Sequence, residues 1–180
     1  MTESSITFAW AARDVVIIRI KGRGTFENSP YFQDLVQKLR NQNPNVKIIV
    51  DLSDCISMDS TFMGTLAGIS TEQNKAGEGY LTVVNTREHT RHLLQNLGLS
   101  YILDMRDHQD VEVNEDQFQE IVTNNSLSKF EKIIHMIEAH TRLVNLDDKN
   151  EMRFQSVIKY LQDSLEREKQ KQKQETDQKD

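Results

Sequence analysis

The sequence is poor in residues and patterns that often define a fold or a compartment. Its 180 residues include a single cysteine, two prolines and seven glycines. One cysteine cannot form an internal disulfide. Long hydrophobic runs are missing too, because the longest one near the start, residues 15–18, is far too short to cross a bilayer and no later run improves on it. The sequence therefore predicts no membrane span.

An excess of positive charge is also lacking, since 28 acidic side chains outnumber 22 basic ones and the net charge is −6. No basic face emerges before the mixed-charge C-terminal residues, which argues against a general nucleic-acid binder and favours protein partners. Residues 1–14 have neither the basic region nor the apolar core of a signal peptide. We therefore expect a cytoplasmic protein that binds other proteins.

Patterns that would indicate an enzyme are incomplete. The glycines at 22 and 24, and those at 77 and 79, lack the full spacing and the lysine of a phosphate-binding loop. Cys55 lies in an acidic loop, where neighbouring carboxylates raise the pKa of a thiol and argue against a nucleophile. We interpret Cys55 as a small, partly buried residue, and we expect no catalytic residue, no cofactor and no enzymatic activity.

The five histidines do not form a pattern typical of a metal site. His89 and His92 are three residues apart in a predicted helix, but no carboxylate-rich motif accompanies them. His135 and His140 are five residues apart, which is poor geometry for a shared ion, and we expect both at the polar border of their helix. The sequence therefore predicts no metal site.

Strand-like and helix-like segments alternate up to about residue 107. Strands are predicted at residues 6–10, 15–20, 46–50, 80–84 and 101–103, and helices over residues 30–41, from Ser60 onward and over residues 88–96. Ser29 is a good N-cap type for the first helix, and Pro30 suits its first position. The first two strands are close enough for an antiparallel pair. The sequence predicts an α/β fold for residues 1–107, a small mixed β-sheet with helices packed on it.

Residues 46–70 are the most informative part of this domain. An apolar, β-branched run ends at Asp51, and the acidic loop that follows leads to a second helix. Asp59 and Ser60 are good N-cap types, and apolar residues recur at helical spacing after them. A hydroxyl at this position is a natural phosphate site, because free N–H groups and the positive end of the helix dipole tolerate a phosphate there. The same serine could also serve only as an N-cap.

Asp51-Leu52-Ser53, followed by Met58-Asp59-Ser60-Thr61 and Gly64, resembles a STAS domain of the anti-sigma-factor antagonist type. The resemblance implies that Ser60 is the phosphoacceptor, with Thr61 as the alternative. It also implies phosphorylation by a serine kinase that is itself the anti-sigma-factor-like partner, and dephosphorylation by a dedicated serine phosphatase. Binding then occurs without the phosphate, because the added charge beside Asp59 brings like-charge repulsion and a desolvation cost to the docking face.

The resemblance further implies a partner-binding surface formed by the loop after Gly22 and the start of the serine helix. Its residues here are Arg23, Asn28, Ser29, Met58, Asp59, Thr61 and Phe62. The family usually continues after its phosphoacceptor with a second serine and two glycines around an aliphatic residue, whereas this chain has the bulky Phe62. We expect the ring of Phe62 to alter this surface, either for a different partner or as a hydrophobic anchor for the same type of partner.

Residues 108–180 are predicted to form a helical extension, because glycine and proline are absent from Gln109 onward and helical spacing takes over. Two near-heptad rhythms predict two helices joined near residues 145–150; their apolar positions are Leu127, Phe130, Ile134, Ile137 and Val144, then Phe154, Ile158, Leu161 and Leu165. This hairpin is expected to pack on the first domain, to form a homodimer with a second copy or to capture a partner. Residues 166–180 lack apolar side chains, and we expect fraying after about Lys171.

These features predict a phosphorylation-regulated interaction module of a bacterial partner-switching system. The alternative is a STAS protein that binds a ligand, such as a nucleotide or a lipid, or that scaffolds a complex through its C-terminal helices, with Ser60 serving only a structural role.

Overall fold

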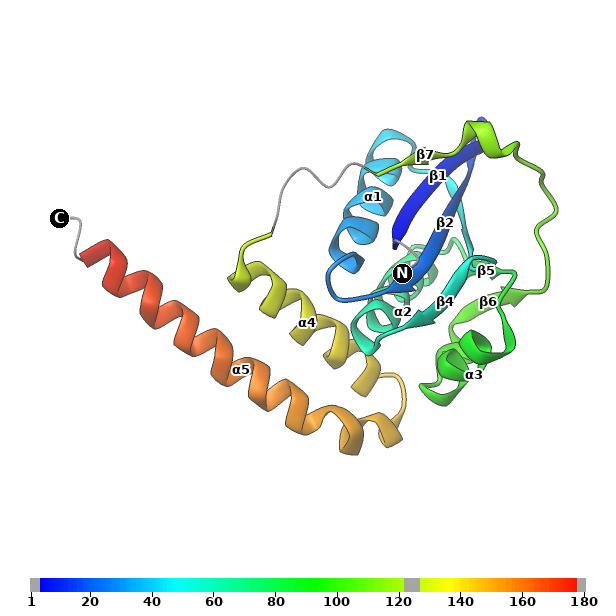
Figure 1. Ribbon diagram of the computed structural model, residues 1–180. Helices are drawn as coiled ribbons and strands as arrows, with labels where there is room; N and C mark the ends of the chain where they lie inside the picture. Colours follow the sequence, from blue (N-terminus) through cyan, green and yellow to red (C-terminus); the bar gives the residue numbers. More distant parts are fainter. Residues whose placement is uncertain (1–3, 122–126, 178–180) are drawn as a thin grey trace.

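The computed structural model describes residues 4–121 and 127–177. Within these residues, the first part of the chain contains one mixed sheet of seven strands (Figure 1). The strands are β1 (Ser5–Ala12), β2 (Val15–Gly24), β3 (Lys47–Asp51), β4 (Cys55–Met58), β5 (Leu81–Val84), β6 (Leu103–Arg106) and β7 (Gln119–Glu120). Their order is β6-β5-β3-β2-β1-β7, and β4 pairs with the end of β2. The predicted mixed sheet is confirmed.

The sheet changes from antiparallel to parallel pairing at β2. β1 pairs antiparallel with β2, whereas β2, β3, β5 and β6 are parallel to one another. Parallel neighbours need crossover connections, and α1 (Ser29–Gln42), α2 (Ser60–Lys75) and α3 (Glu88–Asn96) supply them. This topology brings the loop after β2 and the loop before α2 to the same end of the sheet.

The core lies between the sheet and helices α1 and α2. Val16, Ile18 and Ile20 alternate along β2 and are fully buried, as the period of two in a strand requires. They belong to one cluster with Phe32 of α1 and Leu66 of α2. Burying an aliphatic or aromatic side chain of this size contributes roughly 1.5–3 kcal/mol, so this cluster is the main source of stability in the first domain.

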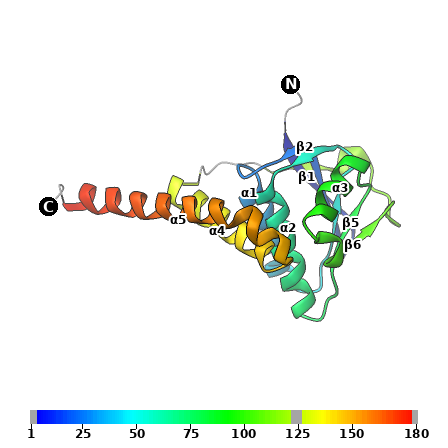
Figure 2. The ribbon, with the colours of Figure 1, turned by 90° about the horizontal axis from the view of Figure 1, so that it is seen from below.

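The C-terminal extension is a helical hairpin that packs on the first domain. α4 (Lys129–Val144) lies against α2, and α5 (Asp148–Asp177) lies against α4. Figure 2 shows α1 and α2 between the sheet and this hairpin. The buried Asn150 side chain donates to the carbonyl oxygens of Leu97 and Leu143, at 3.0 and 2.8 Å, and so fixes the start of α5 beside the end of α3. Among the arrangements predicted for the hairpin, the structure shows packing against the first domain.

Several local predictions need correction. Two short strands were missed: β4 in the predicted acidic loop, and β7, which pairs with Thr7 and Phe8 of β1 inside the predicted helical extension. β7 has only two residues, too few to show a period, and β4 (CISM) lacks the β-branched run that marks β5 (LTVV). The last predicted strand begins at Leu103, because Gly98 at φ +80° is followed by a 3-10 turn, Leu99–Tyr101.

Two helix ends also differ from the predictions. The residue that precedes α1 is Asn28, and Ser29 is already helical. α5 continues to Asp177, beyond Lys171, where fraying was expected. Lysine, glutamate and glutamine are good helix formers, and the pair of Lys169 with Glu166, at 2.8 Å, has the spacing that stabilises exposed helices. None of the described helices has an apolar stretch that could cross a membrane.

Candidate functional site

Asp59 fixes the start of α2 and joins it to the loop after β2. Its Oδ1 atom accepts from the backbone N–H of Phe62 at 2.9 Å, which is the N-cap bond of the helix, and its Oδ2 atom accepts from the N–H of Phe26 at 2.7 Å. An N-cap of this kind contributes about 1 kcal/mol. The two segments that were predicted to form one surface are therefore adjacent.

The loop before α1 is held by the side chain of Asn28. Its amide oxygen accepts from the N–H of Thr25, and its amide nitrogen donates to the carbonyl of Arg23, both at 2.8 Å. With both groups used inside the loop, Asn28 makes no side-chain cap bond to α1. This bracing fixes the loop next to Asp59.

Ser60 is the first residue of α2, and its hydroxyl is bonded to a histidine of α4. The Oγ atom lies 2.9 Å from Nε2 of His140, and Nδ1 of His140 lies 2.7 Å from the carbonyl oxygen of Met136. A carbonyl can only accept, so in the neutral imidazole the proton is on Nδ1 and Nε2 accepts the hydroxyl proton of Ser60. The ring of Phe154 from α5 packs against His140, with ring centroids 5.1 Å apart.

His135, five residues earlier on α4, forms a second bridge to the first domain. Its Nε2 atom lies 2.9 Å from Oγ of Ser29 and 3.2 Å from Oγ1 of Thr65. Thr65 donates its own hydroxyl proton to the carbonyl of Thr61, so it can only accept from the imidazole, and His135 carries its proton on Nε2. Burial lowers the pKa of His135 to about 4, and the nearby charge of Arg142 adds to the shift. His135 is therefore neutral at pH 7.

Two glycines allow α4 to approach α2 closely. A Cβ atom on Gly64 would lie 2.6 Å from the carbonyl carbon of Ala139, which is backbone and cannot give way. A Cβ atom on Gly68 would meet the guanidinium end of Arg142 at the same distance. Arg142 also forms an ion pair with Glu72 at 3.5 Å. Ser60, Gly64, Gly68 and Glu72 are four residues apart along α2, so they share the face that α4 covers.

Both histidines and the apolar stripe of α4 were placed on the wrong face by the sequence. His135 and His140 are 9 % and 5 % exposed, not at a polar border. The buried residues of α4 are Ile133, His135, Ala139, His140 and Leu143, whereas the predicted apolar positions in this helix are only half-buried. The prediction assigned the buried face of α4 from the spacing of its large aliphatic residues. The face of α2 that α4 contacts carries glycines, however, and the close approach there is filled by small and polar side chains of α4. The spacing of Gly64 and Gly68 was the available signal for this contact.

The predicted partner residues divide into two groups in the structure. Asn28, Asp59 and Ser60 are partly exposed, and Arg23 is exposed. Ser29, Met58 and Thr61 are buried. The expectation that the ring of Phe62 lies on the surface is wrong, because Phe62 is fully buried and stacks on Phe32 with centroids 5.4 Å apart. Gly24 has no side chain and lies directly against this ring, which is why the larger residue fits inward.

Cys55 is fully buried in β4 and more enclosed than predicted. Burial raises the pKa of its thiol to about 11, although hydrogen bonds and the charge of Arg87 act in the opposite direction. The predicted direction agrees with this value, but the cause is desolvation and not the acidic loop. A thiol with this pKa is unreactive at neutral pH.

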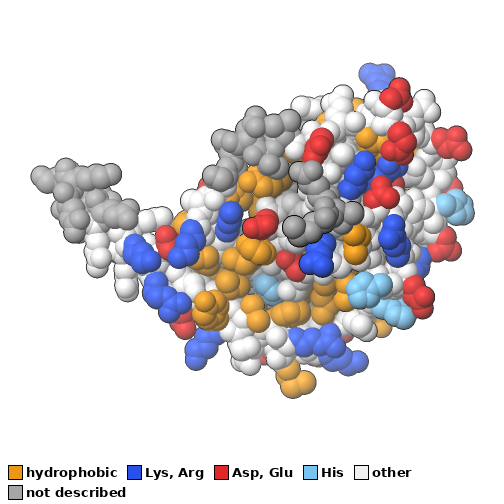
Figure 3. Space-filling view, in the orientation of Figure 1, with side chains coloured by type: hydrophobic (Ala, Val, Ile, Leu, Met, Phe, Trp, Pro, Cys, Tyr) orange, Lys and Arg blue, Asp and Glu red, His pale blue; other side chains and the backbone are white. Residues whose placement is uncertain are grey.

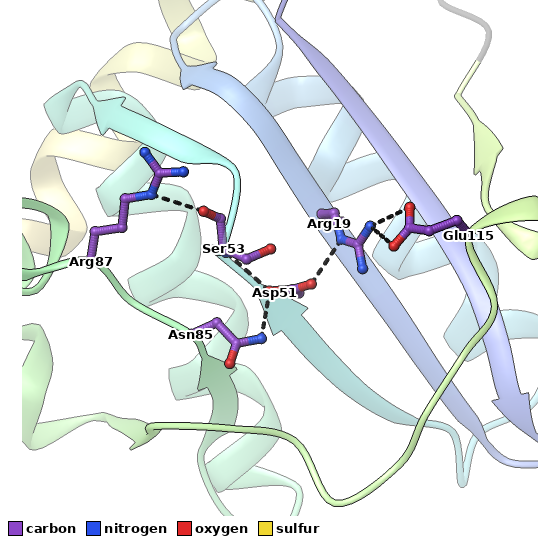
Figure 4. Close-up of polar contacts among 6 residues, drawn as sticks. All are labelled: Arg19, Asp51, Ser53, Asn85, Arg87 and Glu115. Carbon is purple, nitrogen blue, oxygen red and sulfur yellow. Dashed lines mark hydrogen bonds and ion pairs between the residues drawn. The ribbon is translucent and has the colours of Figure 1, made fainter.

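A second polar cluster lies on the other face of the sheet, away from α2 (Figure 4). Nε of Arg19 donates to Asp51 at 2.8 Å, and the buried carboxylate also accepts from the Asn85 side chain at 2.9 Å and from the N–H of Ser53 at 3.0 Å. Burial alone would raise the pKa of Asp51, but the hydrogen bonds from Asn85, Ser53 and Arg19 outweigh it and hold that pKa below its usual value. Asp51 is therefore a charged structural residue.

The segment between β6 and β7 closes over Arg19. Glu115 accepts two hydrogen bonds from Nη1 of Arg19, at 2.7 and 2.8 Å, and the Phe118 ring lies 4.1 Å from the guanidinium carbon. Arg87 reaches the carbonyl of Ser53 at 2.9 Å on the opposite side of the cluster. These contacts tie the start of the extension to the sheet and leave the cluster no open acid–base pair.

The face of the molecule seen in Figure 1 is mixed in charge. Figure 3 shows lysine and arginine side chains interspersed with aspartate and glutamate on the face seen in Figure 1. This is not the continuous basic surface that binding to nucleic acids uses. Within the described residues, no group of three histidine, cysteine, aspartate or glutamate side chains is placed to hold a metal ion.

Residues 11–111 match the family model of the STAS domain, a match that covers more than half of the chain. The chain belongs to the STAS family. The predicted resemblance is thereby confirmed. Asp59, Ser60 and the loop before α1 lie inside the STAS region, whereas α4 and α5 lie outside it.

Solved structures to which the chain is similar include a protein from Thermotoga maritima and two forms of SpoIIAA. A candidate anti-sigma factor antagonist from Thermotoga maritima is 27% identical, with 60% of this chain and 87% of that chain covered and a TM-score of 0.49. The anti-sigma factor antagonist SpoIIAA in its unphosphorylated form is 18% identical, with 61% and 91% covered and a TM-score of 0.46. The Bacillus cell fate determinant SpoIIAA in the phosphorylated form is 19% identical, with 60% and 93% covered and a TM-score of 0.44. The comparison with curated proteins gave no match.

Proposed function

We propose that this STAS protein is a phosphorylation-regulated interaction module of a bacterial partner-switching system. It acts in the cytoplasm by binding and not by catalysis, and its partner is a serine kinase of the anti-sigma-factor type. The observation that carries the proposal is the position of Ser60, the first residue of α2, directly after the N-cap Asp59 and only partly buried. A phosphate there is next to the free N–H groups of a helix start.

The switch consists of two reactions at one oxygen atom. The kinase transfers the γ-phosphoryl group of ATP to Oγ of Ser60, so an O–P bond forms, ADP leaves and the hydroxyl proton is released. A serine phosphatase hydrolyses the same bond with water, which restores the hydroxyl and frees inorganic phosphate. Thr61 is the second acceptor in this proposal, although its side chain is only 3 % exposed and Ser60 is the better placed hydroxyl.

The phosphate acts locally on the docking face. It adds close to two negative charges beside Asp59, whose carboxylate is already engaged with two backbone N–H groups. A partner surface that matches the unmodified face must then desolvate a dianion and accept like-charge repulsion. In this proposal the partner contacts Asn28, Ser29, Met58 and Asp59, and the buried Phe62 supports the surface from inside.

Affinity capture with four baits, the parent protein and its Ser60→Ala, Ser60→Asp and Ser100→Asp variants, tests this function. We expect Ser60→Ala to retain the partner, Ser60→Asp to lose it at least tenfold, and the kinase with ATP to add one phosphate to the parent and none to Ser60→Ala. Ser100→Asp, at an exposed serine far from α2 in the sequence, controls for the added charge. Equal retention of a kinase-like partner by all four forms, or a phosphate at another residue, would refute the proposal.

A scaffolding role through α5 is the second candidate, because this helix leaves large apolar side chains exposed. Met152 and Tyr160 are 85 % and 66 % exposed, and Val157 lies between them in the sequence. A second copy of the chain is the occupant to test. If the helix forms a homodimer, sedimentation will show a dimer that Tyr160→Glu converts to a monomer, whereas a monomeric parent excludes this role.

A further inference from the structure

The hairpin occupies the same surface that the proposed partner would need. α4 covers α2 along the face of Ser60, Gly64, Gly68 and Glu72, and each of these residues meets α4. The loop side of the surface is covered as well, because His135 reaches Ser29. The contact between α4 and this surface is intramolecular.

We infer that the α4–α5 hairpin is an internal competitor for the partner-binding surface, and that it must leave α2 before Ser60 can be phosphorylated. The inference rests on the proposed function, since it describes the regulation of the same site. While the hairpin is docked, the hydroxyl proton of Ser60 is held by Nε2 of His140, and His140 itself is shielded by Phe154. A kinase active site cannot reach Oγ past these two side chains.

Phosphorylation and docking also exclude each other chemically. Transfer of a phosphoryl group to Oγ removes the hydroxyl hydrogen, so the bond from Ser60 to the neutral imidazole of His140 is lost. The new group would have to be accommodated between α2 and α4, next to the place where Gly64 and Ala139 leave no space for one extra carbon atom. A phosphorylated Ser60 therefore favours the open hairpin, and a docked hairpin favours the unmodified serine.

The contacts of α4 describe the partner that can replace it. Such a partner presents a helix with a small residue opposite Gly64, because the backbones approach there as closely as Gly64 and Ala139 do. It offers a hydrogen-bond acceptor to the Ser60 hydroxyl, in the place of His140. It also carries a cation that reaches Glu72, in the place of Arg142. The unmodified STAS surface is thus specific for a helix of this kind.

Thiol labelling at position 60 tests the inference without any kinase or partner. In a full-length Ser60→Cys protein, a thiol reagent reports access to this position, and the buried Cys55 reports unfolding of the first domain in the same molecule. Leu143→Ala removes the α4 side chain that joins the core cluster of the first domain, so it should favour hairpin opening. Thr141→Ala, on the exposed side of α4, is the matched control.

We expect Leu143→Ala to raise the labelling rate at position 60 at least about 30-fold, the low end of what truncating a buried leucine does to an equilibrium constant. Cys55 should stay unreactive, and Thr141→Ala should label like the parent. Arg142→Ala, which removes the contacts with Gly68 and Glu72, is a milder second variant and should give a smaller increase. Equal labelling of all forms, or joint labelling of position 60 and Cys55, would overturn the inference.

The same variants in a Ser60 background separate this inference from the proposed function. With the captured kinase and ATP, Leu143→Ala should be phosphorylated faster than the parent and Thr141→Ala should not. If labelling responds to Leu143→Ala but no kinase modifies Ser60 in any form, the hairpin is a cover and the proposed phosphoswitch is wrong. If all forms are phosphorylated equally fast, the phosphoswitch stands and the internal competitor is refuted.

Discussion

The sheet domain and the hairpin are held by different kinds of contact. Inside the first domain, aliphatic side chains of the sheet and of α1 and α2 form one continuous cluster with little exposed area. The contact between α2 and α4 combines a few apolar residues with polar bridges from His135, His140 and Arg142. At its far end, Asn150 and Arg153 bond to backbone carbonyls near the end of α3.

The hairpin therefore depends on polar contacts more than the sheet domain does, and we expect it to detach more easily. Polar contacts that water can replace contribute roughly 0.5–1.5 kcal/mol each, whereas the apolar core cannot separate without unfolding. Stability in a protein is not uniform, and segments with few buried apolar contacts open first. We therefore expect two transitions, one for the hairpin and one for the sheet domain, and variants that act on one or the other.

The largest effect is expected from Arg19→Met, which acts on the sheet domain. The substitution leaves the carboxylate of Asp51, which is 1 % exposed, without its cation and leaves Glu115 unpaired. Breaking a buried pair by removing one partner costs about 3–5 kcal/mol. Urea unfolding should show this loss in the free energy of unfolding of the sheet domain.

Arg106→Met is the control for this prediction. Arg106 pairs with Asp104 at 2.5 Å, but both side chains are substantially exposed, and exposed pairs contribute about 0–1 kcal/mol. If Arg19→Met costs no more than Arg106→Met, the Asp51 cluster does not hold the sheet domain together.

Acidification should loosen the hairpin, through His135. In the docked form this histidine is neutral and its pKa is about 4, whereas in the open form its pKa returns to the ordinary value near 6.5. Between these values the open form binds more protons, so docking is strongest above pH 6.5 and weakens as the pH falls toward 4, by up to about 3 kcal/mol. The labelling rate at position 60, measured from pH 7 to pH 4.5 and corrected for thiol ionisation, should reveal this trend.

His135→Asn separates the histidine from carboxylates that also titrate in acid. An asparagine cannot take up a proton in this range, yet it retains a neutral hydrogen-bonding group. We expect the pH trend to flatten in this variant. A trend as steep as that of the parent would assign the effect to other groups.

Gly64→Ala should displace the hairpin more than Gly68→Ala. The new Cβ meets backbone of Ala139 in the first case and the flexible end of Arg142 in the second. Overpacking against atoms that cannot move costs roughly 1–3 kcal/mol, whereas Arg142 can turn away. Hydrogen exchange of the α4 amides measures how far each variant lowers their protection, and we expect the larger loss in Gly64→Ala. Equal protection in the two variants would show that the close approach of α2 and α4 does not limit docking.

The smallest effects are expected from the two N-caps, one in each region. Asp59→Ala removes the cap of α2 and the bond to Phe26, and Ser128→Ala removes the capping box of α4 with Glu131. Each should cost about 1 kcal/mol. Denaturant titrations should assign the first loss to the sheet domain and the second to the hairpin. Both losses in a single transition would mean that the two regions unfold as one.

The sequence predicted the STAS fold and the position of Ser60 because their signals are local. The run before Asp51 has the β-branched composition of a buried strand, and Asp59 is followed at once by apolar residues at helical spacing. Asp59 does cap α2, as this pattern indicates. Local propensity and tertiary structure agree in these segments, so little can mislead the prediction.

The parts that were not predicted depend on contacts distant in the sequence. The inward position of Phe62 requires Gly24 and Phe32, and the burial of His135 and His140 requires the glycine face of α2. From sequence alone, a histidine on a helix is predicted to lie at the polar surface. Its burial can be predicted only when its hydrogen-bond partner, here a serine or threonine of the first domain, is known. The cover over Ser60 lies 80 residues away from it in the chain, and no short motif links the two.

Native-state hydrogen exchange of the unmodified protein is the decisive measurement, because it gives the opening free energy of each element in one experiment. We expect the amides of α4 to exchange through an opening several kcal/mol easier than the one that exposes β2 and β3, with the sheet still protected when α4 is open. Exchange of α4 and of the β2 and β3 amides at the same free energy would contradict it, since the hairpin would then be part of the core and not a removable cover over Ser60.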